Sequence, residues 1–369
     1  MAEKSASWTV DEHGPAKVMF LHLPAGYDAI VVIDDVALGP AIGGVRMRPD
    51  ITASEVARLA RAMTLKNAVA GLPHGGGKAG IAAPPDLAPA DHERVLRAFA
   101  RGIEQVTEYI PGPDMGTTET SMAYVYDEIG RAVGVPGALG GVPLDELGAT
   151  GFGLAVCAQV LSEAKIVELA GARVIIQGFG AVGSAAARAI GKRGAVVTAV
   201  SDIRGATCNP AGLDVAALLK YKQSNGSIAG FPGGAAVPRD DILGFDCDIL
   251  IPAAQPDVLT AENAPKVSAR VVLEGANIPA TREAEEELAS RGVLCVPDVI
   301  ANAGGVICAA AEHRGAGRAE AFAEIEEKMR ASTTELIEGM RPGTLPPRVV
   351  ALAMADTRLS QARALRRRF

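Results

Sequence analysis

Apolar and polar residues along the chain follow two patterns, one typical of strands and one typical of helices. Residues 18–36 contain two apolar runs separated by residues 24–26, which predicts two strands joined by a turn. Apolar residues at helical spacing predict a helix over residues 54–70, with Ser54 as its candidate N-terminal cap. A second helical pattern covers residues 91–108, and an extended, proline-containing turn follows at 109–114. The first 145 residues are therefore expected to form one α/β domain.

The pattern changes after Gly148. A helix rich in glycine and alanine is predicted at residues 151–165, followed by a strand, a glycine turn and a helix from residue 172 onward. Further strands are predicted at residues 195–202, 247–252, 270–274 and 293–296. Alternating strands and helices indicate a parallel sheet covered on both faces, so residues 146–312 are expected to form a Rossmann-type, doubly wound domain. Helices over residues 313–369 are expected to pack back on the first domain.

Composition narrows the class of protein. A chain of 369 residues exceeds what one core normally supports, so a two-domain α/β protein with a site in the cleft between its domains is expected. The net charge of −7 argues against a nucleic-acid surface, and the basic residues at 363–369 are expected to be a solvated helix end. Five scattered cysteines fit a reducing compartment and indicate no metal site. The N-terminus lacks a signal-peptide pattern and no apolar run is long enough for a membrane helix, so a cytoplasmic protein is expected.

Residues 63–80 are the strongest chemical signal in the first domain. Lys66 and Lys78 lie twelve residues apart, and three glycines at 75–77 directly precede the second lysine. Such a run indicates tight backbone geometry or close approach to a ligand. A phosphate-binding P-loop would need Ser or Thr after the lysine, where this chain has Ala79. A flexible surface loop with a solvated lysine is the remaining alternative.

A second glycine motif lies in the predicted Rossmann domain. The spacing Gly-x-Gly-x-x-Gly at 178–183 follows a predicted buried strand and opens a helix, whose N-terminus can bind a pyrophosphate. Asp202 ends the next strand, where a carboxylate can accept hydrogen bonds from both ribose hydroxyls and repel a 2′-phosphate. This position favours NAD over NADP, although Arg204 would partly offset the repulsion. Glycines that serve only helix–strand packing are the alternative. The predicted dinucleotide-binding residues are Gly178, Phe179, Gly180, Ala181, Val182, Gly183 and Asp202.

Two lysines, a loop aspartate and a dinucleotide domain together suggest hydride transfer from a substrate with a carboxylate and an amine. One lysine can hold the carboxylate, and the other can act as a base if burial or a nearby cation lowers its pKa. The aspartate is Asp114, for which capping of its own turn is the alternative role.

Seven segments in this chain resemble the glutamate/leucine/phenylalanine/valine dehydrogenases, with matching order and spacing over about residues 18–312. They are residues 39–46, 63–66, 75–78, 113–117, 146–151, 274–277 and 301–305. The resemblance implies NAD-linked oxidative deamination of an L-amino acid in a homo-oligomer built through the first domain. It implies that Lys66 binds the α-carboxylate, that Lys78 activates water and that Asp114 transfers protons to and from the amine. The supporting residues that it implies are Gly43, Gly44 and Asn302 for the substrate, and Thr150 and Asn277 for the nicotinamide.

The side-chain pocket decides which amino acid reacts. Glutamate-specific members of that family hold the γ-carboxylate with a lysine and a serine, at the positions of Ile42 and Ala309 here. An apolar pocket lined by Ile42, Val306 and Ala309 penalises a second carboxylate, so a leucine, valine or phenylalanine-type substrate is expected. Glutamate is the alternative, because the second half of the chain resembles glutamate dehydrogenases and because Arg46 or His74 could supply a cation. An inactive nicotinamide-binding sensor is a rival class, disfavoured because Lys66, Lys78 and Asp114 are all present. A hydroxy-acid oxidoreductase is another rival, disfavoured because it would need a histidine or arginine pair and the five histidines show no matching arrangement.

Overall fold

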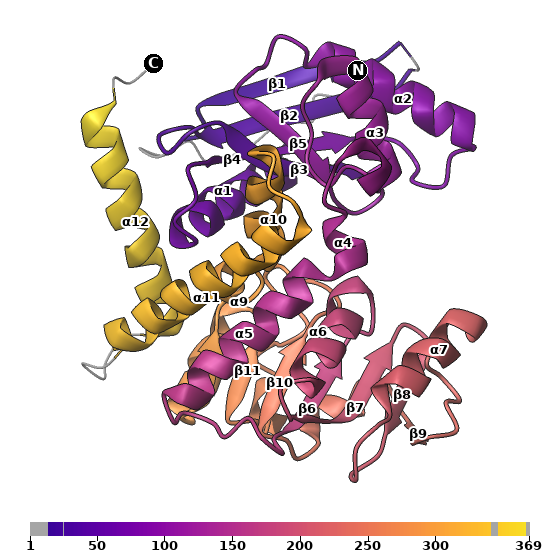
Figure 1. Ribbon diagram of the computed structural model, residues 1–369, viewed down its shortest axis with the longest axis vertical. Coiled ribbons are helices and arrows are strands. Elements are labelled where there is room, and N and C mark those ends of the chain that lie inside the picture. Colours follow the sequence, from indigo (N-terminus) through magenta and orange to yellow (C-terminus); the bar gives the residue numbers. More distant parts are fainter. Residues whose placement is uncertain (1–13, 25, 341–345, 367–369) are drawn as a thin grey trace. The chain divides into compact units, whose positions relative to one another are not determined.

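The structure is a computed structural model that describes residues 14–24, 26–340 and 346–366. The chain divides into two compact units (Figure 1). Unit 1 comprises residues 1–144, 306–324 and 352–369, and unit 2 comprises residues 145–305 and 325–351. The expectation that all of residues 313–369 join the first domain is wrong for residues 325–351. Helix α11 (Arg318–Met340) passes from one unit into the other, and its Met329 packs in unit 2 against the α5 residue Gly153.

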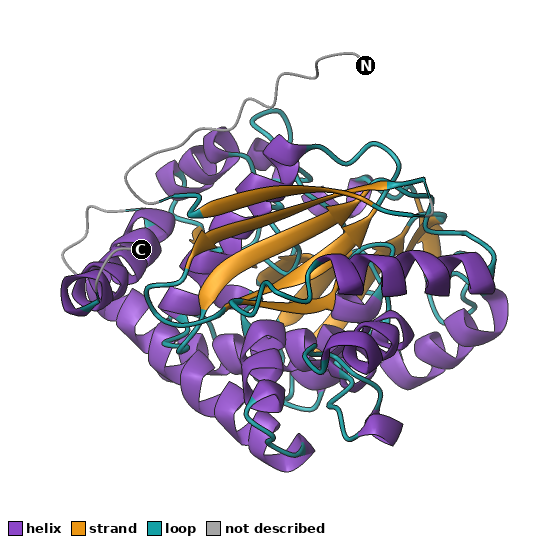
Figure 2. Cartoon of the chain, turned by 90° about the horizontal axis from the view of Figure 1, so that it is seen from above, coloured by secondary structure: helices purple, strands orange, loops and turns teal. Residues whose placement is uncertain are grey.

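The sheet of unit 1 has five strands in the order β1-β2-β4-β3-β5, and they lie side by side in Figure 2. They are β1 (Lys17–His22), β2 (Asp28–Asp35), β3 (Ala41–Met47), β4 (Gly75–Ile81) and β5 (Tyr109–Pro113). The predicted hairpin of β1 and β2 is confirmed, and β3 pairs in parallel with both β4 and β5. The turn predicted at residues 109–114 is instead the edge strand β5. An edge strand tolerates prolines because only one side of it needs ladder hydrogen bonds.

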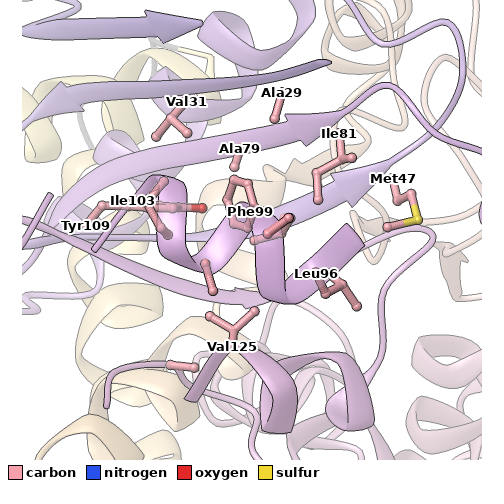
Figure 3. Packing of buried hydrophobic residues seen from close by; sticks show 14 of the residues in the cluster. Ala29, Val31, Met47, Ala79, Ile81, Leu96, Phe99, Ile103, Tyr109 and Val125 are labelled. Atoms are coloured by element: carbon pink, nitrogen blue, oxygen red, sulfur yellow. The ribbon is translucent and has the colours of Figure 1, made fainter. Parts of the chain in front are cut away.

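The helices of unit 1 include α1 (Ala53–Val69), α2 (Pro89–Gly102) and α3 (Glu119–Ile129). Thr52, and not Ser54, caps α1, because its hydroxyl accepts a 3.2 Å hydrogen bond from the Glu55 amide. The second predicted helix ends at Gly102, six residues earlier than its pattern suggested. Phe99 of α2 lies in the apolar core beneath the sheet, together with Val31, Ala79 and Tyr109 (Figure 3).

The C-terminal helix α12 (Pro347–Leu365) is attached to unit 1 at its end. The Arg363 guanidinium lies 2.6 Å from Asp35, so this part of the basic tail is an ion pair and not a solvated helix end. The buried Asp35 carboxylate at the end of β2 requires such a partner. Residues 367–369 of the tail lie outside the described residues.

Unit 2 contains a seven-stranded sheet in the order β12-β11-β10-β6-β7-β8-β9. Strands β12 to β7 are parallel, as the alternating pattern predicted, whereas β8 and β9 add an antiparallel edge that the pattern did not reveal. The strands are β6 (Arg173–Gln177), β7 (Val196–Asp202), β8 (Gly205–Cys208), β9 (Ala235–Val237), β10 (Ile249–Pro252), β11 (Val271–Leu273) and β12 (Leu294–Val296). The four-residue β8 and three-residue β9 are too short to show a period in the sequence.

The helices numbered α4 to α10 complete the chain. They are α4 (Leu144–Leu147), α5 (Ala149–Glu163), α6 (Ala181–Gly191), α7 (Val215–Asn225), α8 (Arg282–Ser290), α9 (Asp298–Ala301) and α10 (Gly304–His313). Short 3₁₀ turns occur at Gly137–Leu139, Asp241–Gly244 and Ala264–Lys266. Among the described residues, no helix is long and apolar enough to cross a membrane.

Candidate functional site

The glycine run before Lys78 forms part of the buried strand β4. A Cβ atom on Gly75 would lie 1.8 Å from the Asp35 carbonyl oxygen, and one on Gly76 would lie 2.1 Å from the Thr64 amide of α1. The run therefore permits close packing of the neighbouring strand and helix, which confirms the prediction of tight backbone geometry. A flexible surface loop and a phosphate-binding loop are both excluded, because these residues form a central strand.

Lys78 and Asp114 meet at one end of this sheet. The Lys78 Nζ atom lies 2.8 Å from the Asp114 Oδ2 atom, and the lysine side chain is almost completely buried. A Cβ atom on Gly44 would lie 2.7 Å from the Asp114 Cβ and 3.2 Å from the Lys78 Nζ. A side chain at Gly44 would therefore force the lysine and the aspartate apart, which gives a physical reason for glycine beside them.

Arg46 is a third member of this cluster. Its Nε donates a 2.9 Å hydrogen bond to Asp114 Oδ2, and its NH1 group lies 2.9 Å from Glu55 of α1. Burial favours a higher pKa for Asp114, but the charges of Lys78 and Arg46 hold that pKa well below its usual range. Asp114 is thus an ionised carboxylate bound to two cations from neighbouring strands, and not a simple turn cap. Because Arg46 already pairs with Asp114 and Glu55, it is not available to bind a substrate side-chain carboxylate near Ile42.

The remaining predicted residues of unit 1 surround the same strands. The buried Lys66 lies in the last turns of α1, two residues after Thr64. The Tyr109 hydroxyl donates a 2.8 Å hydrogen bond to the Gly43 carbonyl and so holds the backbone of the glycine pair. Ile42 is buried on β3. Val306 and Ala309 lie on α10, in a segment that also belongs to unit 1.

The glycine turn of unit 2 meets the requirements for a dinucleotide, each through a different contact. Gly178 has a φ of +97°, and a Cβ on it would lie 2.6 Å from Ala254. A Cβ on Gly183 would lie 1.9 Å from the Gly178 carbonyl oxygen, so this residue allows α6 to pack on the strand. Gly180 instead faces open space at the N-terminus of α6, where a pyrophosphate would find free amide groups. The geometry thus fits a pyrophosphate better than glycines that serve packing alone.

The contacts of two predicted cofactor residues limit what each can offer a ligand. The Phe179 side chain is fully buried, so this residue has only its backbone to offer a ligand. Both oxygens of Asp202 already accept hydrogen bonds, Oδ1 from the Arg204 and Gly205 amides and Oδ2 from Ser227 and the following amide. Two bonds on each oxygen use the ordinary accepting capacity of a carboxylate. Asp202 therefore presents a negative charge to a ribose and has no vacant acceptor position for its hydroxyls.

Asn277 and Asn302 lie together at the ends of β11 and α9. The Asn302 Nδ2 group donates to the Ala276 carbonyl at 2.9 Å and lies 3.4 Å from Asn277 Oδ1. Its Oδ1 atom is buried and has no hydrogen-bond partner within the described ranges. A buried acceptor of this kind needs a donor, and the carboxamide of a nicotinamide provides one. Thr150 is half-buried in the first turn of α5.

A buried ionic cluster supports this asparagine pair, and the sequence pattern did not reveal it. Arg348 at the start of α12 lies 2.8 Å from Glu274, 3.0 Å from Asp298 and 2.6 Å from Glu285. Asp298 Oδ2 in turn accepts a hydrogen bond from the amide next to Asn277. Glu274, Glu285 and a nearby cysteine could together hold a metal ion, but the Arg348 guanidinium already provides the cation there. The long sequence separation between Arg348 and its partners leaves no local signal for this cluster.

Family models match most of the chain. Residues 15–131 match the dimerisation domain of the Glu/Leu/Phe/Val dehydrogenases, and residues 140–367 match the main model of the glutamate/leucine/phenylalanine/valine dehydrogenases.

Similar proteins and structures agree with the family models. A glutamate dehydrogenase from Aeropyrum pernix is 38% identical over 353 residues, covering 89% of this chain and 84% of that protein. An NADP-specific glutamate dehydrogenase from Saccharolobus shibatae is 41% identical over 284 residues, covering 73% of this chain and 67% of that protein. The leucine-bound form of the hetero-hexameric glutamate dehydrogenase from Thermus thermophilus has a TM-score of 0.88 at 32% identity, covering 96% of this chain and 91% of that one.

Proposed function

Because the chain belongs to the Glu/Leu/Phe/Val dehydrogenase family, we propose that it catalyses the reversible, NAD-linked oxidative deamination of L-glutamate. The amino acid, NAD⁺ and water give 2-oxoglutarate, ammonium, NADH and a proton. The relatives named above are glutamate dehydrogenases and favour this substrate over the apolar one expected from Ile42 and Ala309. The observation that carries the reaction type is the buried contact between Lys78 Nζ and Asp114 Oδ2 beside Gly44.

The groups of unit 1 act on the α-amino-acid end of the substrate. Lys66 binds the α-carboxylate, helped by the backbone at Gly43 and Gly44. Asp114 is ionised, so it can accept a proton from the substrate ammonium and free the nitrogen lone pair for loss of hydride from Cα. Lys78 gives its own proton to solvent and then takes one from the water that attacks the resulting iminium carbon. Ammonium leaves after proton return from Asp114.

The groups of unit 2 bind the dinucleotide. When bound, the nicotinamide ring accepts the hydride. The amides beside Gly180 hold the pyrophosphate, and Thr150 and Asn277 hold the nicotinamide end. The resemblance implied substrate binding by Asn302, but its Oδ1 has no partner among the described residues and can instead accept a hydrogen bond from the carboxamide. We propose NAD as the preferred cofactor because the charge of Asp202 repels a 2′-phosphate, although a relative is NADP-specific.

We further propose a homo-oligomer assembled through unit 1 and located in the cytoplasm. A dimerisation-domain model matches residues 15–131 and one similar structure is described as hetero-hexameric, which supports assembly. Five free cysteines are compatible with a reducing compartment. Light scattering on the purified chain, alone in solution, measures the assembly; a monomer would contradict it.

The experiment is a set of initial rates with ammonium, NADH or NADPH, and a panel of 2-oxo acids. We expect 2-oxoglutarate with NADH to give the highest kcat/KM. Lys78→Ala should lower kcat by about 10²–10⁴-fold, because it removes the group that activates water. Lys192→Ala, a matched change at an exposed lysine, should leave the rate unchanged. Wild-type binding of NADH without turnover of any 2-oxo acid would contradict the proposal, as would full activity in Lys78→Ala.

A further inference from the structure

His74 lies on the strand face that carries the reacting groups. It directly precedes β4, two residues before Gly76 and four before Lys78, and side chains at this spacing share one face of a strand. The β3–β4 register pairs Gly76 with Ile42. The His74 ring also contacts the carbonyl of Pro40, which is two residues before Ile42. His74 is therefore close to Ile42, the residue that was expected to line the side-chain pocket.

Helix α10 brings a second histidine to the same place. The rings of His74 and His313 form an edge-on pair, with centroids 5.6 Å apart and planes at 71°. Ala309 lies one helical turn before His313 and so occupies the same face of α10. His74 thus lies between the two elements that carry Ile42 and Ala309. At these two positions, the resemblance implies a lysine and a serine in glutamate-specific members of the family.

The hydrogen bonding of His74 leaves one ring nitrogen available. The side chain is 3% exposed, and its Nδ1 lies 3.1 Å from the Pro40 carbonyl oxygen. A carbonyl only accepts, so Nδ1 carries the proton in that bond. The Nε2 atom is buried and has no partner among the residues that the structure describes. A neutral ring with this tautomer has a lone pair at Nε2, whereas a protonated ring has a second N–H there.

We propose that His74, packed against His313, takes up a proton when substrate binds and donates a charged hydrogen bond from Nε2 to the side-chain carboxylate of glutamate or 2-oxoglutarate. This inference rests on the proposed function and names the group that gives it specificity. Nδ1 keeps its hydrogen bond to the Pro40 carbonyl, so both N–H groups of the imidazolium are hydrogen-bonded. The arrangement supplies a cation where Ile42 and Ala309 supply none, and avoids an unpaired buried carboxylate.

The surroundings of His74 determine the direction of the pH effect. Burial, with a smaller contribution from the charges of His313 and Arg314, lowers the pKa of His74 to about 4, so the free ring is neutral near pH 7. Arg314 is itself paired with Glu324, and Lys78 on the strand side is paired with Asp114. A carboxylate at Nε2 raises the His74 pKa in the complex. Affinity for the dicarboxylate is then highest at low pH and falls, by up to about tenfold per pH unit, as pH rises toward the pKa of the complex.

The test compares two substrates that differ only in the distal carboxylate, 2-oxoglutarate and 2-oxopentanoate, over pH 6–9. In the wild type, the KM for 2-oxoglutarate should rise with pH more steeply than the KM for 2-oxopentanoate. His74→Phe should raise the KM for 2-oxoglutarate by about 10–100-fold, the usual range for a lost charged hydrogen bond. The same variant should leave the KM for 2-oxopentanoate within about twofold of wild type, which also demonstrates an intact active site. His22→Phe, a change at an exposed histidine, should alter neither value.

The outcomes separate the two proposals. Wild-type turnover of 2-oxopentanoate but not of 2-oxoglutarate overturns glutamate as the substrate. Wild-type turnover of 2-oxoglutarate with an unchanged KM and pH profile in His74→Phe overturns only the role of His74. If His74→Phe does not fold, the NMR resonances of the His74 ring decide: binding of 2-oxoglutarate to the wild type should shift them toward the imidazolium at pH 7, and an unshifted ring refutes the inference.

Discussion

The Arg348 cluster offers a prediction in which the structure determines both magnitude and pH dependence. Arg348→Met keeps much of the side-chain volume and removes the cation between Glu274 and Asp298, whose side chains are 0% and 2% exposed. Two charges about 4 Å apart attract by about 4 kcal/mol at an effective dielectric constant of about 20, and desolvation offsets much of this. Removal of the cation leaves buried carboxylates without a partner. We expect the free energy of unfolding to fall by about 3–5 kcal/mol at pH 8.

The pH dependence of this loss follows from Glu274. Burial raises the pKa of Glu274, and the Arg348 charge counteracts that rise, so the variant should have a still higher Glu274 pKa. An acid with a raised folded-state pKa contributes stability at low pH that is lost as pH rises through that pKa. The penalty of Arg348→Met should therefore shrink from pH 8 to pH 5.5, by at most about 1.4 kcal/mol per pH unit for one proton.

Urea unfolding followed by circular dichroism measures both effects, with all samples at one protein concentration because an oligomer's stability depends on it. Arg282→Met is the matched control, since the side chain of this arginine is 85% exposed and pairs on the helix surface with Glu286. We expect a change of at most about 0.5 kcal/mol in the free energy of unfolding. Adding Glu274→Gln to Arg348→Met should recover part of the loss. A loss below about 1 kcal/mol at pH 8, or a loss that is equal at both pH values, would refute the reasoning.

Three further predictions concern other parts of the site. Gly76→Ala should lower the melting temperature sharply because its Cβ would overlap the α1 backbone. The control Gly137→Ala should change the melting temperature little, because a Cβ there meets nothing within 4 Å. Equal melting temperatures of the two variants would contradict the packing role of Gly76. Asp202→Asn should raise the kcat/KM ratio of NADPH to NADH by about tenfold or more through loss of charge repulsion, as initial rates would measure, and an unchanged ratio would remove its role in cofactor choice. Arg46→Gln should raise the pKa of Asp114 and move the acidic limb of the kcat/KM profile to higher pH, so an unmoved limb would show that Arg46 does not tune Asp114.

The local sequence was sufficient for the elements whose pattern is self-contained. The strand, glycine turn and helix around Gly178 and Gly183 were predicted correctly because strand period, turn chemistry and helix start all lie within a few residues of one another. The same holds for α1, where the period was clear, although the cap was Thr52 and not Ser54. The sequence also marked Lys78 as chemically important, through its glycine neighbours.

The tertiary structure decided what the marked residues contact. Gly75 and Gly76 face backbone atoms of β2 and α1. Lys78 itself meets Asp114, which directly follows β5 and lies thirty-six residues later. Likewise, one oxygen of Asp202 is occupied by a loop over twenty residues away, and Arg348 neutralises carboxylates that lie fifty or more residues earlier. Sequence periodicity reports the residues that face a core, but a charge is stabilised by whichever group the fold brings within about 3 Å. The kind of reaction was therefore readable from the sequence alone, whereas the partners of its charged groups, and the open nitrogen of His74, required the folded chain.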